Sequence, residues 1–268
     1  MFARSALLGL LVSLVACSSR ERAANVEPST VSSETPVVLR GNLHPVEVRL
    51  GVRADAPFRL RDRQSNLGAA VRLRGATHVA PSHGATTSEA TTFPRAFGGR
   101  FDVTQRLFAE GVEDFIHFDS APTSREVEYE LELDAEVAGL RLVSNVLELL
   151  DAGGVPRLRM APPWIEHAGV RHDVDVAVRG CQVDVDGRVP WERPVLSPGA
   201  RSCVVRLRWG QEVGYPALLD PAWGSTGSAA VGHNNAATSL LANGDVLIAG
   251  GCTLGTTLTA VGEQAGGR

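Results

Sequence analysis

Strict alternation of charged and apolar side chains is the feature that most limits how this chain can fold. In the stretch EVEYELELD the apolar residues take every second position: Val127, Tyr129, Leu131 and Leu133. Four glutamates take the positions between them: Glu126, Glu128, Glu130 and Glu132. Neighbouring side chains of a strand point to opposite faces, so this pattern predicts a strand with one face in a core and the other in water. We interpret the glutamates as a solvated face that discourages pairing at a sheet edge, in preference to a cation-binding surface.

The same period of two recurs along most of the chain, which predicts the all-β class. It is seen in 46–52, 58–60, 71–73 and 204–209, and in RHDVDVAVRG with Val174, Val176 and Val178 inward. The stretch VLELLDAGGVPRLRM predicts a hairpin, because Gly153 and Gly154 can supply a positive φ where the chain reverses. Prolines 216 and 221 follow the last of these strands and indicate a boundary.

Composition shifts divide the chain into four segments. We expect residues 1–17 to be a signal and the polar residues 18–39, rich in Ser, Thr, Glu and Pro, to be a disordered tether. We expect residues 40–222 to form a β-sandwich-like domain and 223–268 to form a separate motif. Within the domain, residues 76–100 are rich in Thr, Ser, Gly and Ala and predict a long loop or weak edge, where two subdomains would divide.

The first seventeen residues, MFARSALLGLLVSLVAC, place one arginine before an apolar run that ends next to Cys17. The run is far shorter than the roughly twenty residues that cross a bilayer as a helix, which favours a secretion signal. Leu14 to Cys17 resemble the lipobox of bacterial lipoproteins. This resemblance implies that Cys17 carries lipid, begins the mature protein and anchors it in a membrane, and that Ser18 directs it to the outer membrane. The residues alone also allow an ordinary signal peptide cut near Ala16.

Three further cysteines are present: Cys181, Cys203 and Cys252. In an oxidising compartment we expect a disulfide between Cys181 and Cys203, which would destabilise the unfolded chain by roughly 3 kcal/mol. The alternative is that both are small buried apolar side chains, and Cys252 is unpaired in either case. Their spacing and neighbours do not indicate zinc, and we expect no metal or other cofactor.

The charge of the chain argues against a nucleic-acid partner. Its 26 basic residues are all arginine and are outnumbered by 30 acidic residues, for a formal net charge of −4. Binding to nucleic acid requires a concentrated positive surface, which this sequence does not predict.

No motif predicts an enzyme. His172 and Asp173 are adjacent on a predicted strand, so their side chains point apart and cannot form the hydrogen bond of a catalytic triad. A Gly-x-Ser-x-Gly elbow that would supply a nucleophile is missing from the sequence.

Residues 181–189, CQVDVDGRV, have part of the spacing of a calcium loop through Asp184, Asp186 and Gly187. Such a loop also needs an oxygen ligand at its first position and a late glutamate. The late position holds Arg193, so we expect a plain β-turn.

Near the C-terminus, AWGSTGSAAVGHNNAATSLLANGDVLIAGG predicts two apolar strands, 239–242 and 246–249, joined by the turn Asn243-Gly244 and followed by Gly250-Gly251. This order resembles one blade motif of a kelch-repeat β-propeller, over about thirty residues. The following stretch, CTLGTTLTAVGEQAGGR, lacks the aromatic residues of the next kelch strand, so we expect 252–268 to be frayed.

Two stretches farther upstream, VAGLRLVSNVLELLDAGGVPRLRMAPPW and YPALLDPAW, resemble the leader domain of large surface kelch lipoproteins of Gram-negative bacteria. The resemblance covers roughly residues 40–268. It implies a lipid-anchored cell-envelope protein of the outer membrane, periplasmic or surface-exposed, that acts as a non-catalytic binding or scaffold module for a protein or glycan ligand.

Two alternatives stay open. Propellers have four or more blades, so the chain is either a truncated propeller protein or retains one motif as a structural or vestigial envelope protein. The other alternative is a fragment of a copper enzyme resembling galactose oxidase, for which the chain offers only Tyr129 and Tyr215 as tyrosine ligands.

Overall fold

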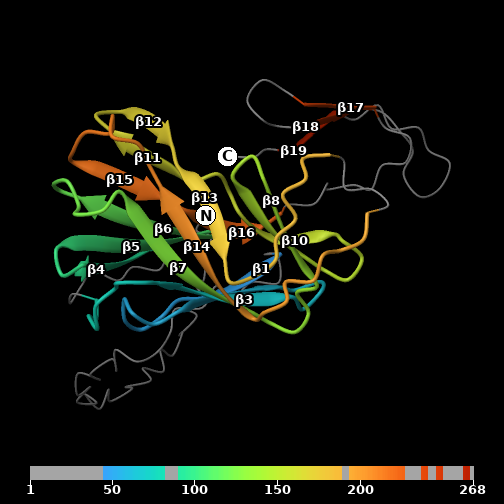
Figure 1. The fold of residues 1–268 in the computed structure, drawn as a ribbon, viewed down its shortest axis with the longest axis horizontal. Helices are drawn as coiled ribbons and strands as arrows, with labels where there is room; N and C mark the ends of the chain where they lie inside the picture. Colours follow the sequence, from blue (N-terminus) through green and yellow to red (C-terminus); the bar gives the residue numbers. More distant parts are fainter. Residues whose placement is uncertain are drawn as a thin grey trace, which may run out of the picture. The chain divides into compact units, whose positions relative to one another are not determined.

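The structure is a computed structural model that describes residues 45–81, 90–188 and 193–226, together with the backbone of three strands between 237 and 265. Every regular element in these ranges is a β-strand (Figure 1), which confirms the all-β class. The predicted signal with Cys17 and the tether 18–39 lie outside the described residues.

The first sheet, sheet A, is antiparallel throughout, in the order β1-β2-β3-β7-β14-β13. Its strands are β1 (Val46–Arg49), β2 (Phe58–Asp62), β3 (Gly68–Leu73), β7 (Glu126–Leu133), β13 (Asp175–Arg179) and β14 (Ser202–Arg208).

The second sheet, sheet B, has the order β12-β11-β15-β6-β16-β10-β9-β8, with β5 paired to β6 and β4 paired to β5. Its first strands are β4 (Ala90–Phe97), β5 (Phe101–Phe108), β6 (Gly111–Phe118), β8 (Gly139–Val143) and β9 (Val146–Leu150). The others are β10 (Pro156–Met160), β11 (Trp164–His167), β12 (Val170–Asp173), β15 (Ala217–Asp220) and β16 (Ala222–Ser225).

Sheets A and B share one hydrophobic core, built from the inward residues of both. At its centre, Trp223 of β16 meets Phe58 of β2 and Tyr129 of β7, with ring centroids 6.4 and 6.1 Å apart. Edge-on aromatic packing of this kind adds to the stability that burial alone supplies. The two sheets therefore pack face to face through their apolar sides.

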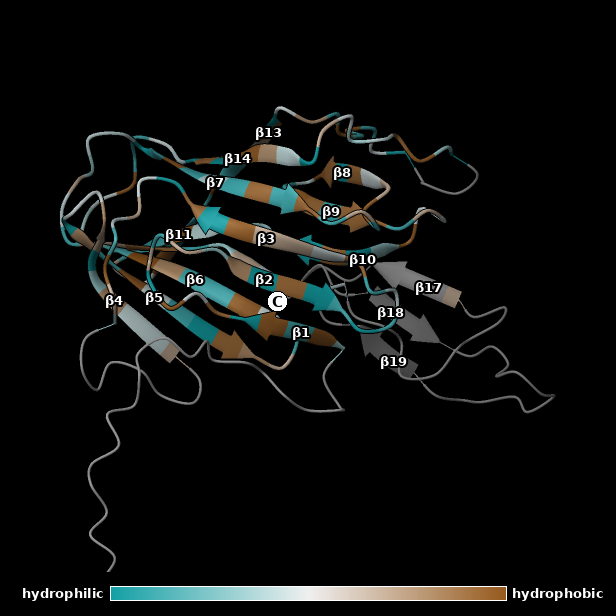
Figure 2. Cartoon of the chain, turned by 90° about the horizontal axis from the view of Figure 1, so that it is seen from below, coloured by the Kyte–Doolittle hydropathy of each residue, from teal (hydrophilic) through white to brown (hydrophobic). Residues whose placement is uncertain are grey.

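Strand β7 has the predicted faces but not the predicted place. Val127, Tyr129 and Leu131 are fully buried, and bands of teal and brown alternate along β7 in Figure 2. However, β7 lies in the middle of sheet A, between β3 and β14. The interpretation of the glutamates as protection for a sheet edge was therefore wrong.

Three of the glutamates of β7 instead pair with arginines that lie on the two adjacent strands or directly after them. Three such ion pairs are formed: Arg72 with Glu130, Arg74 with Glu128, and Arg206 with Glu126. Arg72 lies directly opposite Glu130, whereas Arg206 reaches Glu126 on the diagonal. Opposite charges on adjacent strands stabilise their pairing, although each partly exposed pair contributes less than about 1 kcal/mol.

The segment 76–100 contains more strand than predicted. Its second half forms β4, which pairs with β5 at an edge of sheet B, while residues 82–89 lie outside the described residues. The register shifts between Phe93 and Phe97, where Arg95 has a positive φ and its N–H donates to Asp102. This irregularity makes β4 a poor template for another chain.

The stretch RHDVDVAVRG is two strands, not the single strand that its alternation predicted. Strand β12 belongs to sheet B and β13 belongs to sheet A. Val174 lies between them and is fully buried, and Val176 is also buried while Val178 is half-buried. The chain thus crosses from one sheet to the other at Val174. Buried and exposed residues keep alternating through this crossing, so the sequence pattern does not reveal the change of sheet.

The predicted boundary near prolines 216 and 221 falls inside sheet B. Strands β15 and β16 flank Pro221 and both pair with β6. Thr226, the last residue described in this part of the chain, donates its hydroxyl to the carbonyl of Pro156 at 2.8 Å. The sheet therefore extends several residues past 222.

A third sheet consists of β17 (Ala237–Leu240), β18 (Val246–Ala249) and β19 (Gly262–Ala265), all antiparallel. Its first two strands are antiparallel neighbours, as predicted, but β17 begins and ends two residues earlier than expected, with Leu240 opposite Val246. The prediction that 252–268 is frayed was wrong in part, since β19 pairs with β18. Asn243, Gly244, Gly250 and Gly251 lie outside the described residues.

Candidate ligand-binding cleft

The predicted disulfide between Cys181 and Cys203 is present. Cys203 lies on β14 with 1% of its surface exposed, and Cys181 follows the end of β13. Because β13 and β14 are adjacent strands, the bond closes the loop between them where it leaves sheet A.

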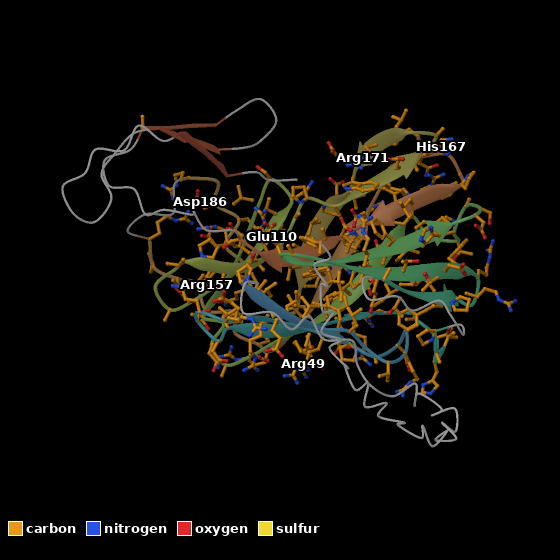
Figure 3. The ribbon with its side chains drawn as sticks, turned by 180° about the vertical axis from the view of Figure 1, so that it is seen from behind. Arg49, Glu110, Arg157, His167, Arg171 and Asp186 are labelled. Atoms are coloured by element: carbon orange, nitrogen blue, oxygen red, sulfur yellow. A yellow bond between two sulfur atoms is a disulfide. The ribbon has the colours of Figure 1, made fainter. Side chains whose placement is uncertain are left out.

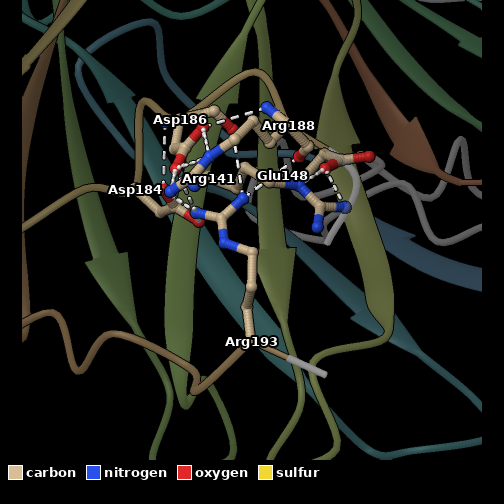
Figure 4. Close-up of polar contacts among 6 residues, drawn as sticks. All are labelled: Arg141, Glu148, Asp184, Asp186, Arg188 and Arg193. Atoms are coloured by element: carbon tan, nitrogen blue, oxygen red, sulfur yellow. Dashed lines mark hydrogen bonds and ion pairs between the residues drawn. The ribbon is translucent and has the colours of Figure 1, made fainter. Parts of the chain in front are cut away.

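The loop inside the disulfide covers the outer edge of β8 in sheet B. The backbone of Asp184 exchanges two hydrogen bonds with Leu140 and Leu142, at 2.9 and 2.8 Å. Its carboxylate receives two more from Arg193, at 2.6 and 2.5 Å. Figure 4 shows this cluster, in which Arg188 also binds Asp186.

Arginine thus supplies the positive charge beside the two aspartates that resemble calcium ligands. Hydrogen bonds from Arg188 hold the pKa of Asp186 below its ordinary value. Throughout the described ranges, no group of three His, Cys, Asp or Glu side chains is placed to hold a metal ion.

The two tyrosines weighed as copper ligands have other contacts. Tyr129 is buried and donates its hydroxyl to Asp114 at 2.8 Å. Tyr215 accepts a hydrogen bond from the indole of Trp209 at 3.1 Å, and its ring packs on Phe118. His172 and Asp173 pair with Ile165 and Trp164 in the β11–β12 hairpin.

The outer face of sheet B carries a cleft of about 720 Å³. It lies where two neighbouring strands are interrupted by proline. Ala161 donates its N–H to Ala222 and Trp164 pairs with Asp220, so Pro162 and Pro163 lie opposite the single residue Pro221. Proline has no N–H for the strand ladder, and two residues against one form a bulge that bends the sheet. The cleft lies over this bend.

Two matched groups of side chains line the cleft. In one, Arg106 pairs with Glu113 at 2.5 Å and lies over the ring of Phe115, 5.1 Å from its centroid. In the other, Arg171 (Figure 3) pairs with Glu166 at 3.1 Å and lies 3.8 Å from the centre of Trp164. Each group combines an aromatic ring, a stacked guanidinium and a carboxylate, all of which can contact a polar ligand.

Asp220 lies between the two groups. On one side of β15, Asp220 lies opposite Trp164 of β11. On the other side, Leu219 lies opposite Ile116 of β6, so the next residue, Asp220, lies beside Phe115. Its side chain is only 4% exposed, and its Oδ1 has no hydrogen-bond partner among the described residues. Burial, and then the charge of Glu113, raise the pKa of Asp220 to about 7. Its carboxyl is a polar group at the cleft that a bound ligand can satisfy.

Arg159 of β10 also lines the cleft. It forms no ion pair or side-chain hydrogen bond within the part of the chain that the structure describes. Arg106 and Arg171 each have a glutamate partner, so the guanidinium of Arg159 differs from them in being available to a ligand.

On the core side of the same sheet, Asp114 is fully buried. Burial raises its pKa to about 6, against the lowering effect of hydrogen bonds from Tyr129 and Gln105. Its N–H donates to the carbonyl of Pro221, the residue after Asp220. The two aspartates therefore lie on opposite faces of one sheet, close enough for the charge of Asp114 to raise the pKa of Asp220.

A second cleft of about 600 Å³ lies near the ends of β7 and β14. Its Arg125 is occupied by the carbonyls of Gly210 and Val213, and its Trp209 is buried. This cleft offers no exposed aromatic face, so it is the weaker candidate for a ligand.

No family model, curated protein or solved structure matches this chain. The described part of the chain also contains no helix with the length and hydropathy to cross a membrane.

Sequence reasoning missed the cleft residues. The local signals were Pro162-Pro163 before Trp164, which received no interpretation, and Pro221 after Asp220, which was interpreted as a boundary. The stretches that carry the leader-domain resemblance, LRMAPPW and LLDPAW, lie side by side in sheet B and form this bend.

Proposed function

We propose that this chain is a lipid-anchored, non-catalytic binding module of the bacterial cell envelope, and that the cleft on sheet B binds a glycan. Lipid on Cys17 would hold the module on the outer membrane. The partial kelch motif at 223–268 would be the start or the remainder of a propeller that the module positions.

The observation that carries the glycan proposal is the position of Asp220, nearly buried and without a partner at Oδ1, between two stacked aromatic and arginine side chains. Sugars present apolar C–H faces to aromatic rings and hydroxyl groups that both donate and accept hydrogen bonds. The cleft supplies both kinds of contact, since its rings are next to carboxylates that accept and guanidiniums that donate.

Two matched variants test whether the cleft binds glycan. Arg49 and Arg171 (Figure 3) lie on different sheets, each with a glutamate partner and 61% of its side chain exposed. We expect Arg171→Ala to weaken binding to envelope polysaccharides at least tenfold and Arg49→Ala to leave it unchanged, as measured by isothermal titration calorimetry. Equal loss in both variants, or binding by neither variant nor the parent protein, would contradict the proposal.

The anchor is tested separately by mass spectrometry of the mature protein from a Gram-negative host. We expect a chain that begins at Cys17 and carries acyl groups. A mature chain with a different first residue and no lipid would remove the anchor from the proposal and leave the cleft unaffected.

A further inference from the structure

Two of the charged residues that line the cleft have no ion-pair partner of opposite charge in the part of the chain that the structure describes. Arg106 with Glu113 and Arg171 with Glu166 form two neutral pairs. This leaves Arg159, which has no ionic partner among the described residues, and Asp220, which is nearly buried. A ligand therefore meets one guanidinium that lacks an acceptor and one carboxyl group that lacks a hydrogen-bond partner at Oδ1.

We propose that the cleft selects an acidic glycan, whose carboxylate binds the guanidinium of Arg159 while the carboxyl of Asp220 faces the same ligand. This inference rests on the proposed glycan-binding function. A guanidinium and a carboxylate match in shape and form two parallel hydrogen bonds, a contact that neutral sugar hydroxyls cannot reproduce. A uronic acid residue supplies such a carboxylate together with the hydroxyls and ring that the rest of the cleft accommodates.

The protonation of Asp220 makes this selection dependent on pH. The charged groups around it on the cleft face are Arg106, Glu113, Arg159, Glu166 and Arg171, and Asp114 lies on the core face of the same sheet. Since burial raises the pKa of Asp220 to about 7, its carboxyl is mostly neutral below that pH and mostly ionised above it. An ionised Asp220 repels a bound carboxylate, whereas a neutral one can donate a hydrogen bond to it. Acidic glycans should therefore bind more tightly as the pH falls.

The test titrates the full mature chain with oligomers of galacturonate, mannuronate and glucuronate, each alongside its methyl-esterified form, at pH 5.5 and 8.5. Uronates remain ionised over this range because carboxyls titrate near pH 4. We expect at least one acidic oligomer to bind about tenfold more tightly than its ester at pH 5.5, and about tenfold more tightly at pH 5.5 than at pH 8.5. The esters should show little dependence on pH.

Two variants assign the effect to its residues. Arg159→Gln should weaken binding of the acid much more than binding of its ester, and so remove the preference for the acid. Asp220→Asn, which is neutral at every pH, should retain tight binding of the acid at pH 8.5. Arg208→Gln, an exposed arginine on sheet A, is the control and should change neither.

The outcomes separate this inference from the function on which it rests. Glycan binding that depends on Arg171 but shows no preference for the acid, or no dependence on Arg159, would overturn the inference and keep the proposed function. Failure of every acidic and neutral glycan to bind would overturn both. Tighter binding of a peptide than of any glycan would also reject both and indicate a protein partner.

Discussion

Replacing Asp114 with Asn should stabilise this protein at neutral pH, even though Asp114 lies at the centre of the core. The carboxyl is fully buried, and its pKa rises from an ordinary 3.8 to about 6. A shift of about two units corresponds to roughly 3 kcal/mol of folding free energy between the two protonation states. Asparagine still accepts the hydrogen bond of Tyr129 and offers an N–H to Gln105, whose Oε1 has no described partner.

The sign of the pH dependence follows from the direction of the shift. The folded state binds the proton of Asp114 more tightly than the unfolded state does. Its contribution to stability is therefore complete below about pH 4 and is lost as the pH rises through about 6. Asp220 acts in the same direction up to about pH 7, whereas desolvation lowers the pKa of His117 and acts in the opposite direction. The comparison between Asp114→Asn and the parent protein isolates the one group.

Urea unfolding at half-unit steps from pH 4.5 to 8.5 measures this effect. At pH 8 we expect Asp114→Asn to exceed the parent protein in unfolding free energy by up to about 3 kcal/mol, and at pH 4.5 by much less. Tyr129→Phe removes the hydrogen bond that stabilises the ionised carboxyl, so it should be destabilised, and more so at pH 8 than at pH 4.5. If Asp114→Asn were the less stable protein at pH 8, or if the difference did not change with pH, the reasoning would be refuted.

Two further predictions concern covalent and ionic links between strands. The variant Cys203→Ser should lower the unfolding free energy by about 3 kcal/mol, because its disulfide closes a loop of 22 residues, and the reduced parent protein should match it in the same urea titration. Glu130→Gln should lower the free energy of unfolding by less than about 1 kcal/mol and should reduce its dependence on salt, because the ion pair with Arg72 is partly exposed and screened. A decrease of more than about 2 kcal/mol would contradict this prediction.

The parts of the fold that were predictable are those written in short stretches of sequence. The faces of β7 follow from alternation between adjacent residues, and the β9–β10 hairpin follows from its glycines, of which Gly154 has a positive φ of 77°. The disulfide followed from the number of cysteines and the expected compartment. The errors concern which strands are neighbours. Strand β7 was predicted at a sheet edge but lies in the middle of sheet A, and the single strand predicted around Val174 is two strands in two different sheets.

The candidate cleft was beyond prediction for the same reason. Its aromatic and charged residues come from strands far apart in the sequence: Phe115 on β6, Arg159 on β10, Trp164 on β11 and Asp220 on β15. By itself, the sequence determined that the chain forms strands and which side chains share a face, because period two depends only on adjacent residues. Only the tertiary structure decided which strands lie side by side, because strand pairing joins distant segments through backbone hydrogen bonds that are the same for almost every residue type. That pairing places Asp220 between two aromatic rings and next to the bend that three prolines create.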